Sequence, residues 1–376
     1  MDPGNPDVVW IGVEFKGVFK SLNGGRTWAR SDAGISGYPV ESRPDDRCIQ
    51  EMGKIVVDPA DSNHVLLSRI ESPGTLAMPF SENAGLWETR DGGQLWTQLL
   101  KPGMNASGSG ALALGPAAPG QPPVIYLGSN NNPPSWNGAH QEYFHTDGIL
   151  YQTTDGGATW RELPTGVAGG LRSWAVFVNP VNPGHLWFVV LFAPTDTRVQ
   201  SSLQWTYLES RDGGETWERG ADRFPPSYRA PAEAAVAPAN FNHRMLVTMT
   251  DDGPQAMFYT TDGGATWAQA SHYMFAARYD PHDRSGRRLL GYKPFDGDGI
   301  FESRDAGATW QRYANLPPEV NNSDYFGVRI SEIVWHPRNP NIVFMSGSGG
   351  YAWKSTDSGR TWTTILALEQ VGGPNR

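Results

Sequence analysis

Short apolar runs alternate with polar turns along the whole chain. Between residues 53 and 100, apolar or aromatic runs lie at 53–57, 64–69, 85–90 and 94–100. A proline turn follows the first run, and "DGG" joins the third run to the fourth. Runs of β-branched and aromatic residues bounded by Gly, Pro and Asp are typical of strands joined by hairpins. This segment is therefore predicted to form four short strands.

Two turn motifs recur in step with these strands. The first is a Gly-rich turn followed by a tryptophan, as in "SRDGGETW", and its seven copies end at Trp28, Trp96, Trp160, Trp217, Trp267, Trp310 and Trp362. The second is a proline turn such as "VDPADSNHVLLS", which also occurs seven times. Successive copies of the first motif are 43 to 68 residues apart, which indicates a repeat array.

One copy of each motif makes one four-stranded unit. A single four-stranded sheet cannot bury both of its faces, whereas seven sheets packed around an axis can. The predicted fold is all-β: one domain over residues 1–376, a seven-bladed β-propeller of four-stranded antiparallel blades.

The Gly-rich turn has a structural explanation. Glycine adopts positive φ at little cost, and an Asp side chain accepts hydrogen bonds from the N–H groups of its own turn. The tryptophan then falls on the fourth strand, where it packs between neighbouring sheets. Asn23 replaces Asp in the first copy and can fill the same role.

Composition narrows the range of partners. The net charge is −9 and the pI about 5.4, so a duplex nucleic acid is a poor partner. No apolar run approaches the length of a membrane span. Cys48 is the only cysteine, which excludes an internal disulfide and a cysteine metal cluster. We expect a monomer in an extracellular or periplasmic location, with any leader absent from this chain.

The motif Ser/Thr-x-Asp-x-Gly-x-Thr-Trp resembles the Asp box, also called the bacterial neuraminidase repeat. Sialidases, two-propeller xyloglucan-active glycoside hydrolases, sortilin-type receptors and photosystem II assembly factors share it. Sialidases carry an Arg-Ile-Pro tripeptide that is missing here. The paired turn motifs resemble the xyloglucanase, sortilin and assembly-factor branch. Such a fold does not by itself decide the function.

Two arrangements could close the ring. "MDP" at the start of the chain matches the end of an innermost strand, but the body of that strand is missing. Either the chain is truncated or the segment after Trp362, "TTILALEQVGG", supplies the strand. We favour closure by this C-terminal segment.

Acidic residues end three of the predicted second strands: Glu14, Glu71 and Asp251. The segment "VVWIGVEFKGVFK" resembles one in the two-propeller glycoside hydrolases, which implies a catalytic acid at Glu14. A glycosidase needs two carboxyl groups about 5–5.5 Å or 6.5–9.5 Å apart, and Glu14 and Glu71 lie on adjacent blades. These acids are the catalytic candidates, and solvated acids at a channel mouth are the alternative.

The face opposite the Asp boxes is predicted to carry the site because its loops at 70–86, 129–148 and 191–206 are long. Candidate sugar-binding side chains on these loops are Trp136, His140, Tyr143 and Trp205. Their aromatic rings suit the apolar C–H faces of sugars, although packing of the loops is the alternative.

The predicted innermost strands begin at Glu51, Arg172, Tyr273 and Arg329, and these strands line the channel. Two Arg side chains can bind a carboxylate bidentately, which would suit an acidic sugar. Ordinary buried ion pairs would show the same residues.

The favoured function is a glycoside hydrolase acting on a polysaccharide or oligosaccharide through a carboxylate pair in the funnel. A non-catalytic propeller that binds glycans or proteins or assists assembly is the first alternative. The second is a lyase on acidic polysaccharide with Tyr273 as the base. No cofactor or catalytic metal is expected, and a structural calcium ion at Asp296 and Asp298 is the alternative to a plain polar turn.

Overall fold

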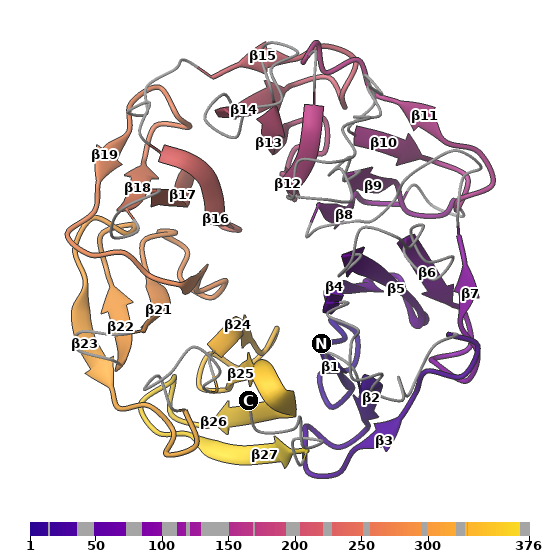
Figure 1. The fold of residues 1–376 in the computed structure, drawn as a ribbon, viewed down its shortest axis with the longest axis vertical. Coiled ribbons are helices and arrows are strands. Elements are labelled where there is room, and N and C mark those ends of the chain that lie inside the picture. Colours follow the sequence, from indigo (N-terminus) through magenta and orange to yellow (C-terminus); the bar gives the residue numbers. More distant parts are fainter. Residues whose placement is uncertain are drawn as a thin grey trace, which may run out of the picture.

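The computed structural model shows a ring of seven antiparallel sheets around a central channel (Figure 1). The structure describes residues 1–13, 16–35, 49–72, 85–99, 111–117, 121–128, 150–167, 170–192, 204–220, 228–250, 256–294, 299–320, 328 and 330–368. The seven-bladed β-propeller predicted from the sequence is confirmed. Six blades have four strands each, and blade 1 has three among the described residues.

Strands follow one another from the channel to the rim, in chain order. Blade 1 contains β1 (Val9–Val13), β2 (Gly17–Ser21) and β3 (Ala29–Arg30). Blade 2 contains β4 (Ile49–Asp58), β5 (Asp61–Ser72), β6 (Gly85–Thr89) and β7 (Thr97–Gln98). Blade 3 contains β8 (Leu112–Leu114), β9 (Ile125–Gly128), β10 (Leu150–Thr153) and β11 (Arg161–Glu162). Blade 4 contains β12 (Gly170–Val178), β13 (Leu186–Phe192), β14 (Gln204–Ser210) and β15 (Glu218–Arg219).

Blades 5 to 7 repeat this order. Blade 5 contains β16 (Tyr228–Ala237), β17 (Asn240–Thr250), β18 (Ala256–Thr260) and β19 (Ala268–Gln269). Blade 6 contains β20 (Ala276–Tyr279), β21 (Leu289–Lys293), β22 (Gly299–Ser303) and β23 (Gln311–Ala314). Blade 7 contains β24 (Ile330–Trp335), β25 (Val343–Gly347), β26 (Tyr351–Ser355) and β27 (Thr363–Ala367). A 3-10 turn, η2 (Ser348–Gly350), joins β25 to β26.

Each Asp box is a turn held by its own side chains. In blade 4, the Ser210 hydroxyl accepts a hydrogen bond from the Gly214 N–H at 2.8 Å, and Asp212 accepts one from the Thr216 N–H at 2.9 Å. Gly213 and Gly214 have φ of 77° and 96°, which glycine adopts without strain. In blade 1, Asn23 Oδ1 accepts the Thr27 N–H at 2.9 Å, as the sequence predicted.

The core lies between the blades. Seven clusters of described buried residues each join two neighbouring blades. The tryptophan of each box packs in the cluster shared with the preceding blade. Trp267 of blade 5, for example, stacks on Trp187 of blade 4 with ring centroids 6.3 Å apart. The prediction that this residue holds two blades together is confirmed.

The same contact joins the two ends of the ring. Trp28 of blade 1 packs in the cluster shared with blade 7, and its Nε1–H donates to the carbonyl oxygen of Ile365 at 3.0 Å. Residues 363–367 form β27, the outer strand of blade 7, and pair with β26. Residues 369–376 lie outside the described range, so closure by that part of the C-terminal segment stays a prediction.

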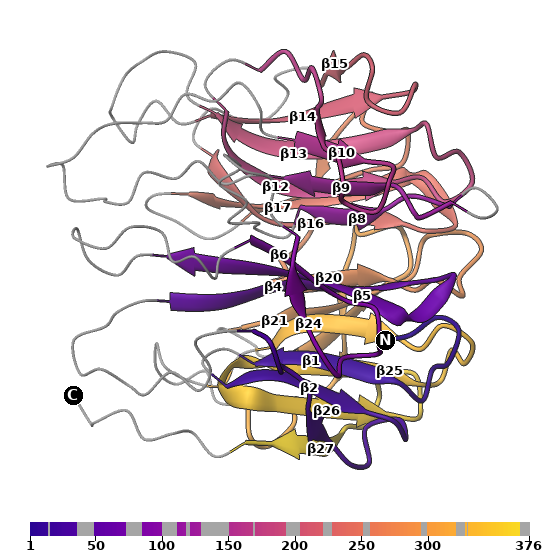
Figure 2. The ribbon, with the colours of Figure 1, turned by 90° about the vertical axis from the view of Figure 1, so that its right-hand side faces the viewer.

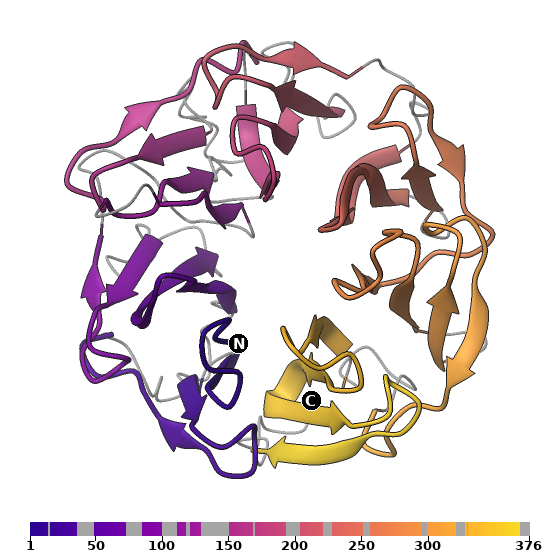
Figure 3. The same cartoon turned by 180° about the vertical axis from the view of Figure 1, so that it is seen from behind.

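The two faces of the ring differ in which strand ends they carry. The second strand of every blade begins at the proline-turn face, which also carries the Asp boxes, and runs towards the opposite face. The strands lie roughly along the ring axis in the edge-on view, and the reverse face shows the same seven blades (Figures 2 and 3). Within the described residues, no helix has the length and apolar character needed to cross a bilayer.

Candidate functional site

Described residues line a hollow in the central channel. It has a volume of about 800 Å³. Its walls come from β1, from the innermost strands of blades 2, 4, 5, 6 and 7, and from the segment 344–350. Blades far apart in sequence therefore contribute side chains to one space.

A repeated irregularity in the innermost strands sets which side chains face this space. The pairing of β4, β12, β16 and β24 with the next strand shifts register beside Lys54, Ala175, Glu233 and Glu332, respectively. Each of these residues lies four positions before the turn residue at the strand end. A β-bulge adds a residue to one strand and redirects side chains, and all four positions line the channel.

Arg278 on β20 bridges the two glutamates of this set. Its Nη1 lies 2.7 Å from Glu233 Oε1 of blade 5, and its Nε lies 2.7 Å from Glu332 Oε1 of blade 7. Nη1 also donates to the Ala277 carbonyl oxygen at 2.9 Å. One guanidinium thus connects three consecutive blades across the channel wall.

Burial shapes the protonation of this cluster. Enclosure by the surrounding chain raises the pKa of Glu233, and the nearby Glu332 charge adds to this while Arg278 opposes it. Enclosure lowers the pKa of Arg278, but attraction to Glu233 and Glu332 outweighs it and holds the pKa above its ordinary value. Loss of solvation inside the channel also lowers the pKa of Lys54, whose side chain is exposed to the channel and lies near both acids.

The contacts within this cluster indicate a structural role. Both carboxylates already hold the Arg278 guanidinium, so neither is free to face a sugar across an open gap. An alignment of the strand starts does not reveal Lys54, Glu233 and Glu332, which lie further along their strands. Aligning the residues four positions before each turn would have revealed them.

Of the predicted catalytic acids, only Glu71 belongs to a described strand, and its backbone lies at the face opposite the Asp boxes. Glu71 is the penultimate residue of β5, and its backbone pairs with Gln50. Glu14 follows Val13, the last residue of β1, and lies outside the described residues, as does Asp251. The side chain of Glu71 is not described.

Several other predicted site residues fall partly or wholly outside the described range. Glu51 pairs with Ile70 in blade 2, and Arg172 pairs with Leu191 in blade 4, in each case by backbone position only. The residues outside the described range are Trp136, His140, Tyr143, Asp296, Asp298 and Arg329.

Two aromatic candidates are placed differently from the expectation. Trp205 lies inside strand β14, is 8% exposed and packs with Trp187 and Tyr207 between blades 4 and 5. Tyr273 precedes β20 and packs against the core cluster between blades 5 and 6. Trp205 is therefore not an exposed platform, and Tyr273 belongs to the interblade core. Their apolar rings are more stable between packed sheets than in water.

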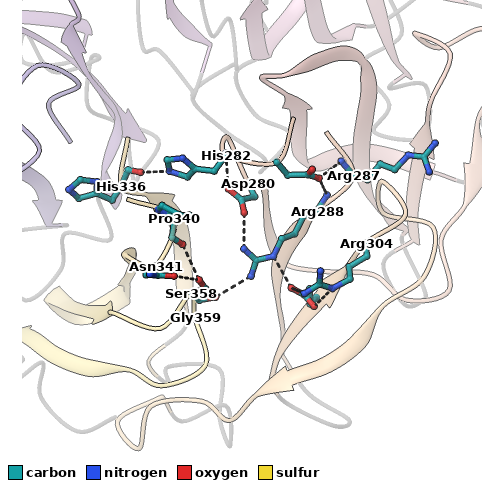
Figure 4. Close-up of polar contacts among 12 residues, drawn as sticks. Asp280, His282, Arg287, Arg288, Arg304, His336, Pro340, Asn341, Ser358 and Gly359 are labelled. Atoms are coloured by element: carbon teal, nitrogen blue, oxygen red, sulfur yellow. Dashed lines mark hydrogen bonds and ion pairs between the residues drawn. The ribbon is translucent and has the colours of Figure 1, made fainter. Parts of the chain in front are cut away.

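Acids and bases also meet at the Asp-box face, in blades 2, 4 and 6. In blade 6, Arg288 binds Asp280 through Nη1 at 2.7 Å and Glu302 through Nε at 2.8 Å (Figure 4). The Arg288 Nη2 also donates to the Ser358 carbonyl oxygen of blade 7 at 3.3 Å. These charges are buried and paired, as structural ion pairs usually are.

Histidines take the place of Arg288 in blades 2 and 4. His64 lies between Asp58 Oδ2 at 3.0 Å and Glu88 Oε2 at 3.2 Å. Burial opposes the charged imidazole, yet the bonds to Glu88 and Asp58 hold its pKa above the ordinary value. His185 contacts Glu209, which Arg244 and Arg211 also bind, and burial lowers the pKa of His185.

The described residues contain no candidate metal site. Among them, no three His, Cys, Asp or Glu side chains are grouped so that they could hold an ion.

The sequence is similar to known proteins along much of its length. The model described as "BNR/Asp-box repeat" matches residues 258–269. A xyloglucanase from Paenibacillus sp is 24% identical over 315 residues, which cover 72% of this chain and 28% of that protein. An oligoxyloglucan-reducing end-specific xyloglucanase from Emericella nidulans is 25% identical over 284 residues, covering 69% of this chain and 30% of that protein. The chain therefore spans less than a third of the length of these curated relatives.

Solved structures agree on the fold. The GH74 xyloglucanase from Xanthomonas campestris matches 98% of this chain and 54% of its own, with a TM-score of 0.64 and 17% identity. An ancestral GH74 enzyme matches 97% of this chain and 45% of its own, with the same TM-score and 15% identity. The repeat match and the seven-bladed ring together show that this protein is an Asp-box β-propeller.

Proposed function

We propose that this protein is a glycoside hydrolase that acts on a polysaccharide or oligosaccharide of the xyloglucan class. The observation that carries the proposal is the similarity to two xyloglucanases over 72% and 69% of the chain. Each alignment is long enough to cover several blades, so the similarity extends beyond the Asp-box motif itself. The chain spans less than a third of the length of each relative, so the activity of the relatives is proposed for this chain.

The proposed catalytic pair is Glu14 and Glu71, in the funnel at the face opposite the Asp boxes. Two features of the fold support this choice. β1 and β5 belong to adjacent blades, and both run away from the box turns, so the residues at their ends share one face. The channel glutamates Glu233 and Glu332 are the weaker candidates because Arg278 binds both.

The test replaces each acid by its amide. Glu14→Gln and Glu71→Gln should each lower the release of reducing ends from xyloglucan by about 10²-fold or more, the usual contribution of a catalytic acid or base. Thermal unfolding should shift by no more than about 2 °C, as expected for a polar surface change. Glu218→Gln, on the exposed outer strand β15, is the matched control and should keep full activity.

Full activity in both variants would exclude this pair. A panel of neutral and acidic polysaccharides separates the remaining functions. Binding without product over long incubation would support a non-catalytic glycan-binding propeller. An unsaturated uronide at the new non-reducing ends would instead support a lyase, since β-elimination also leaves one new reducing end per cleavage.

A further inference from the structure

The charges of the Asp-box face are divided unevenly around the ring. Each blade brings one proline turn and one Asp box to this face. In blades 6, 7 and 1, these turns contain nine Lys or Arg and seven Asp or Glu, in residues 280–288, 302–310, 336–342, 354–362, 2–8 and 20–28. In blades 2 to 5, they contain two Lys or Arg and nine Asp or Glu, in residues 58–64, 88–96, 115–117, 121–124, 152–160, 179–185, 209–217, 237–243 and 259–267. A chain with a net charge of −9 thus has a cationic sector, the turns of blades 6, 7 and 1, on one face.

Most acids of the cationic sector already bind groups of their own turns. Asp283 accepts hydrogen bonds from the N–H groups of Arg287 and Arg288 at 2.8 and 2.7 Å. Five further acids likewise accept hydrogen bonds from nearby turn groups or from the Arg288 side chain: Asp2, Asp280, Glu302, Asp305 and Asp357. Because these carboxylates are held inside their turns, they are not available to pair with the exposed arginines around them.

The arginines of this sector point outward instead. Five of them are exposed and contact no carboxylate of the described residues: Arg26, Arg284, Arg287, Arg338 and Arg360. Figure 4 shows the Arg287 guanidinium extending away from the ion pairs of Arg288. In the other half of the face, by contrast, Arg90 and Arg211 each bind a glutamate of their own blade, at 2.9 and 3.2 Å.

Contacts between neighbouring blades make the cationic sector continuous. The guanidinium carbons of Arg288 and Arg360 lie 5.9 and 5.7 Å from the centre of the same Tyr313 ring, which joins the parts from blades 6 and 7. Arg338 Nη2 donates to the Gly4 carbonyl oxygen at 2.8 Å, which joins blade 7 to blade 1. The unpaired arginines are therefore spread over three consecutive blades.

This spread favours a polymer over a small anion. A single exposed ion pair contributes little, so a ligand gains from this surface only by reaching several guanidinium groups at once. The planar guanidinium group pairs bidentately with carboxylates. A carboxylated polysaccharide offers one such group per acidic sugar, at a lower charge density than duplex nucleic acid, with one charge per about 1.7 Å. The lower density suits a protein whose net charge is −9.

A membrane surface fits the cationic sector less well. Proteins that bind to the bilayer surface combine basic residues with several apolar side chains that enter the lipid. Among the described residues of these turns, Leu22 is the only exposed large apolar side chain.

We propose that the cationic sector docks an acidic polysaccharide, a polymer of uronate residues, through pairs between guanidinium and carboxylate groups. The choice of a polysaccharide rests on the proposed function. The sector lies on the face opposite the funnel in which the catalytic pair is proposed. Docking therefore leaves the funnel open to a second, neutral chain while it holds the protein on the acidic one.

Binding to immobilised polygalacturonate tests this proposal. The full chain should bind in about 50 mM NaCl and be released as the concentration rises to about 300 mM, since salt screens exposed ion pairs. The fully methyl-esterified polymer, which lacks the charges, should not bind. Combining Arg284→Gln, Arg287→Gln and Arg360→Gln should lower the affinity by about tenfold or more, because several contacts are lost together.

A matched triple variant controls for net charge. Arg90→Gln, Arg161→Gln and Arg211→Gln remove the same charge from blades 2 to 4, where the three side chains are 53%, 47% and 66% exposed. This variant should change the affinity by less than about twofold. Thermal unfolding of both triple variants should stay within about 3 °C of the unaltered protein, as expected for exposed side chains.

Three results would overturn the proposal. The first is the absence of salt-sensitive binding by the unaltered protein. The second is an equal loss of affinity in both triple variants, since net charge alone would then explain it. The third is binding to vesicles that contain phosphatidylserine but not to polygalacturonate, which would assign the sector to a membrane surface.

Hydrolysis of xyloglucan separates this proposal from the proposed function. Both triple variants should release reducing ends at the rate of the unaltered protein, because the substituted arginines lie on the face opposite the funnel. Salt-sensitive binding to polygalacturonate by a protein that does not cleave xyloglucan would support the docking surface and refute the hydrolase.

Discussion

His64 and His185 occupy the same position in two blades but carry opposite pKa shifts. His64 lies within β5 and His185 immediately precedes β13, and each contacts a Glu of the third strand of its blade. His64 has a second acid, Asp58, whereas the equivalent residue in blade 4 is Asn179. Glu209 also shares its charge with Arg244 and Arg211. Burial disfavours the charged form of both rings, and the acids and cations around each imidazole set the direction of its pKa shift.

This contrast predicts opposite pH dependence of stability. The pKa of His64 is raised in the folded state, so its contribution is full below the unfolded pKa of 6.5 and is lost as the pH rises through the folded pKa. The pKa of His185 is lowered, so its contribution is present above 6.5 and is lost as the pH falls. His64→Gln should therefore lower the Tm more at pH 5.5 than at pH 8, and His185→Gln should do the reverse.

Thermal unfolding of both variants across this pH range checks the prediction, with the exposed His272→Gln as the control. Parallel pH profiles for the two variants would show that the Asp58 and Asn179 difference does not determine the charge.

At the scale of the element, the bulges of the innermost strands matter most. They turn Lys54, Glu233 and Glu332 into the channel, where Arg278 connects blades 5, 6 and 7. The side chains of Arg278 and Glu332 remain 27% and 41% exposed, so water in the channel weakens the attraction. The bridge therefore stabilises less than a fully buried ion pair would.

Arg278→Met should lower the free energy of unfolding by about 2 kcal/mol at pH 7, between the values for exposed and buried pairs. The loss arises because Glu233 and Glu332 no longer share the guanidinium that bridges them and repel each other more strongly. Glu233→Gln in the Arg278→Met background should recover part of the loss, since it removes one of the two charges. Urea unfolding of the single and double variants measures this coupling. A double variant less stable than Arg278→Met alone would contradict the repulsion.

At the scale of the whole molecule, the box tryptophans join the ring. Each packs in the cluster shared with the preceding blade, and Trp28 makes this contact between blade 1 and blade 7. The first and last blades are thus held by the same interaction as every other pair.

Removing this one contact should loosen the junction locally. Trp28→Ala should cost about 3 kcal/mol, at the low end for a large aromatic because the ring is only partly buried. Trp217→Ala, the matched change between blades 3 and 4, should cost a similar amount. Hydrogen exchange should then rise in residues 9–13 and 363–367 for Trp28→Ala only. Equal protection there in both variants would show that other contacts hold blades 1 and 7 together.

The repeats predicted the fold because each box carries its own turn chemistry. Ser210, Asp212 and Gly214 form their hydrogen bonds within five residues, so sequence alone specifies them. The channel cluster was not predicted because its members are up to hundreds of residues apart and depend on bulges that change which side chains face inward. Trp205 was assigned to a loop because the sequence does not mark where β14 begins. The acids Glu14 and Glu71 remain predictions.

The position of the box tryptophan separates the unit of sequence from the unit of packing. A repeat encodes one blade, yet its tryptophan completes the core shared with the blade before it. Duplication or loss of one repeat therefore creates a new junction in which the incoming tryptophan must fit an existing neighbour. Because the ring is closed, a change in blade number also alters the angle at every other junction, so each tryptophan must tolerate a small change in how it packs against the preceding blade.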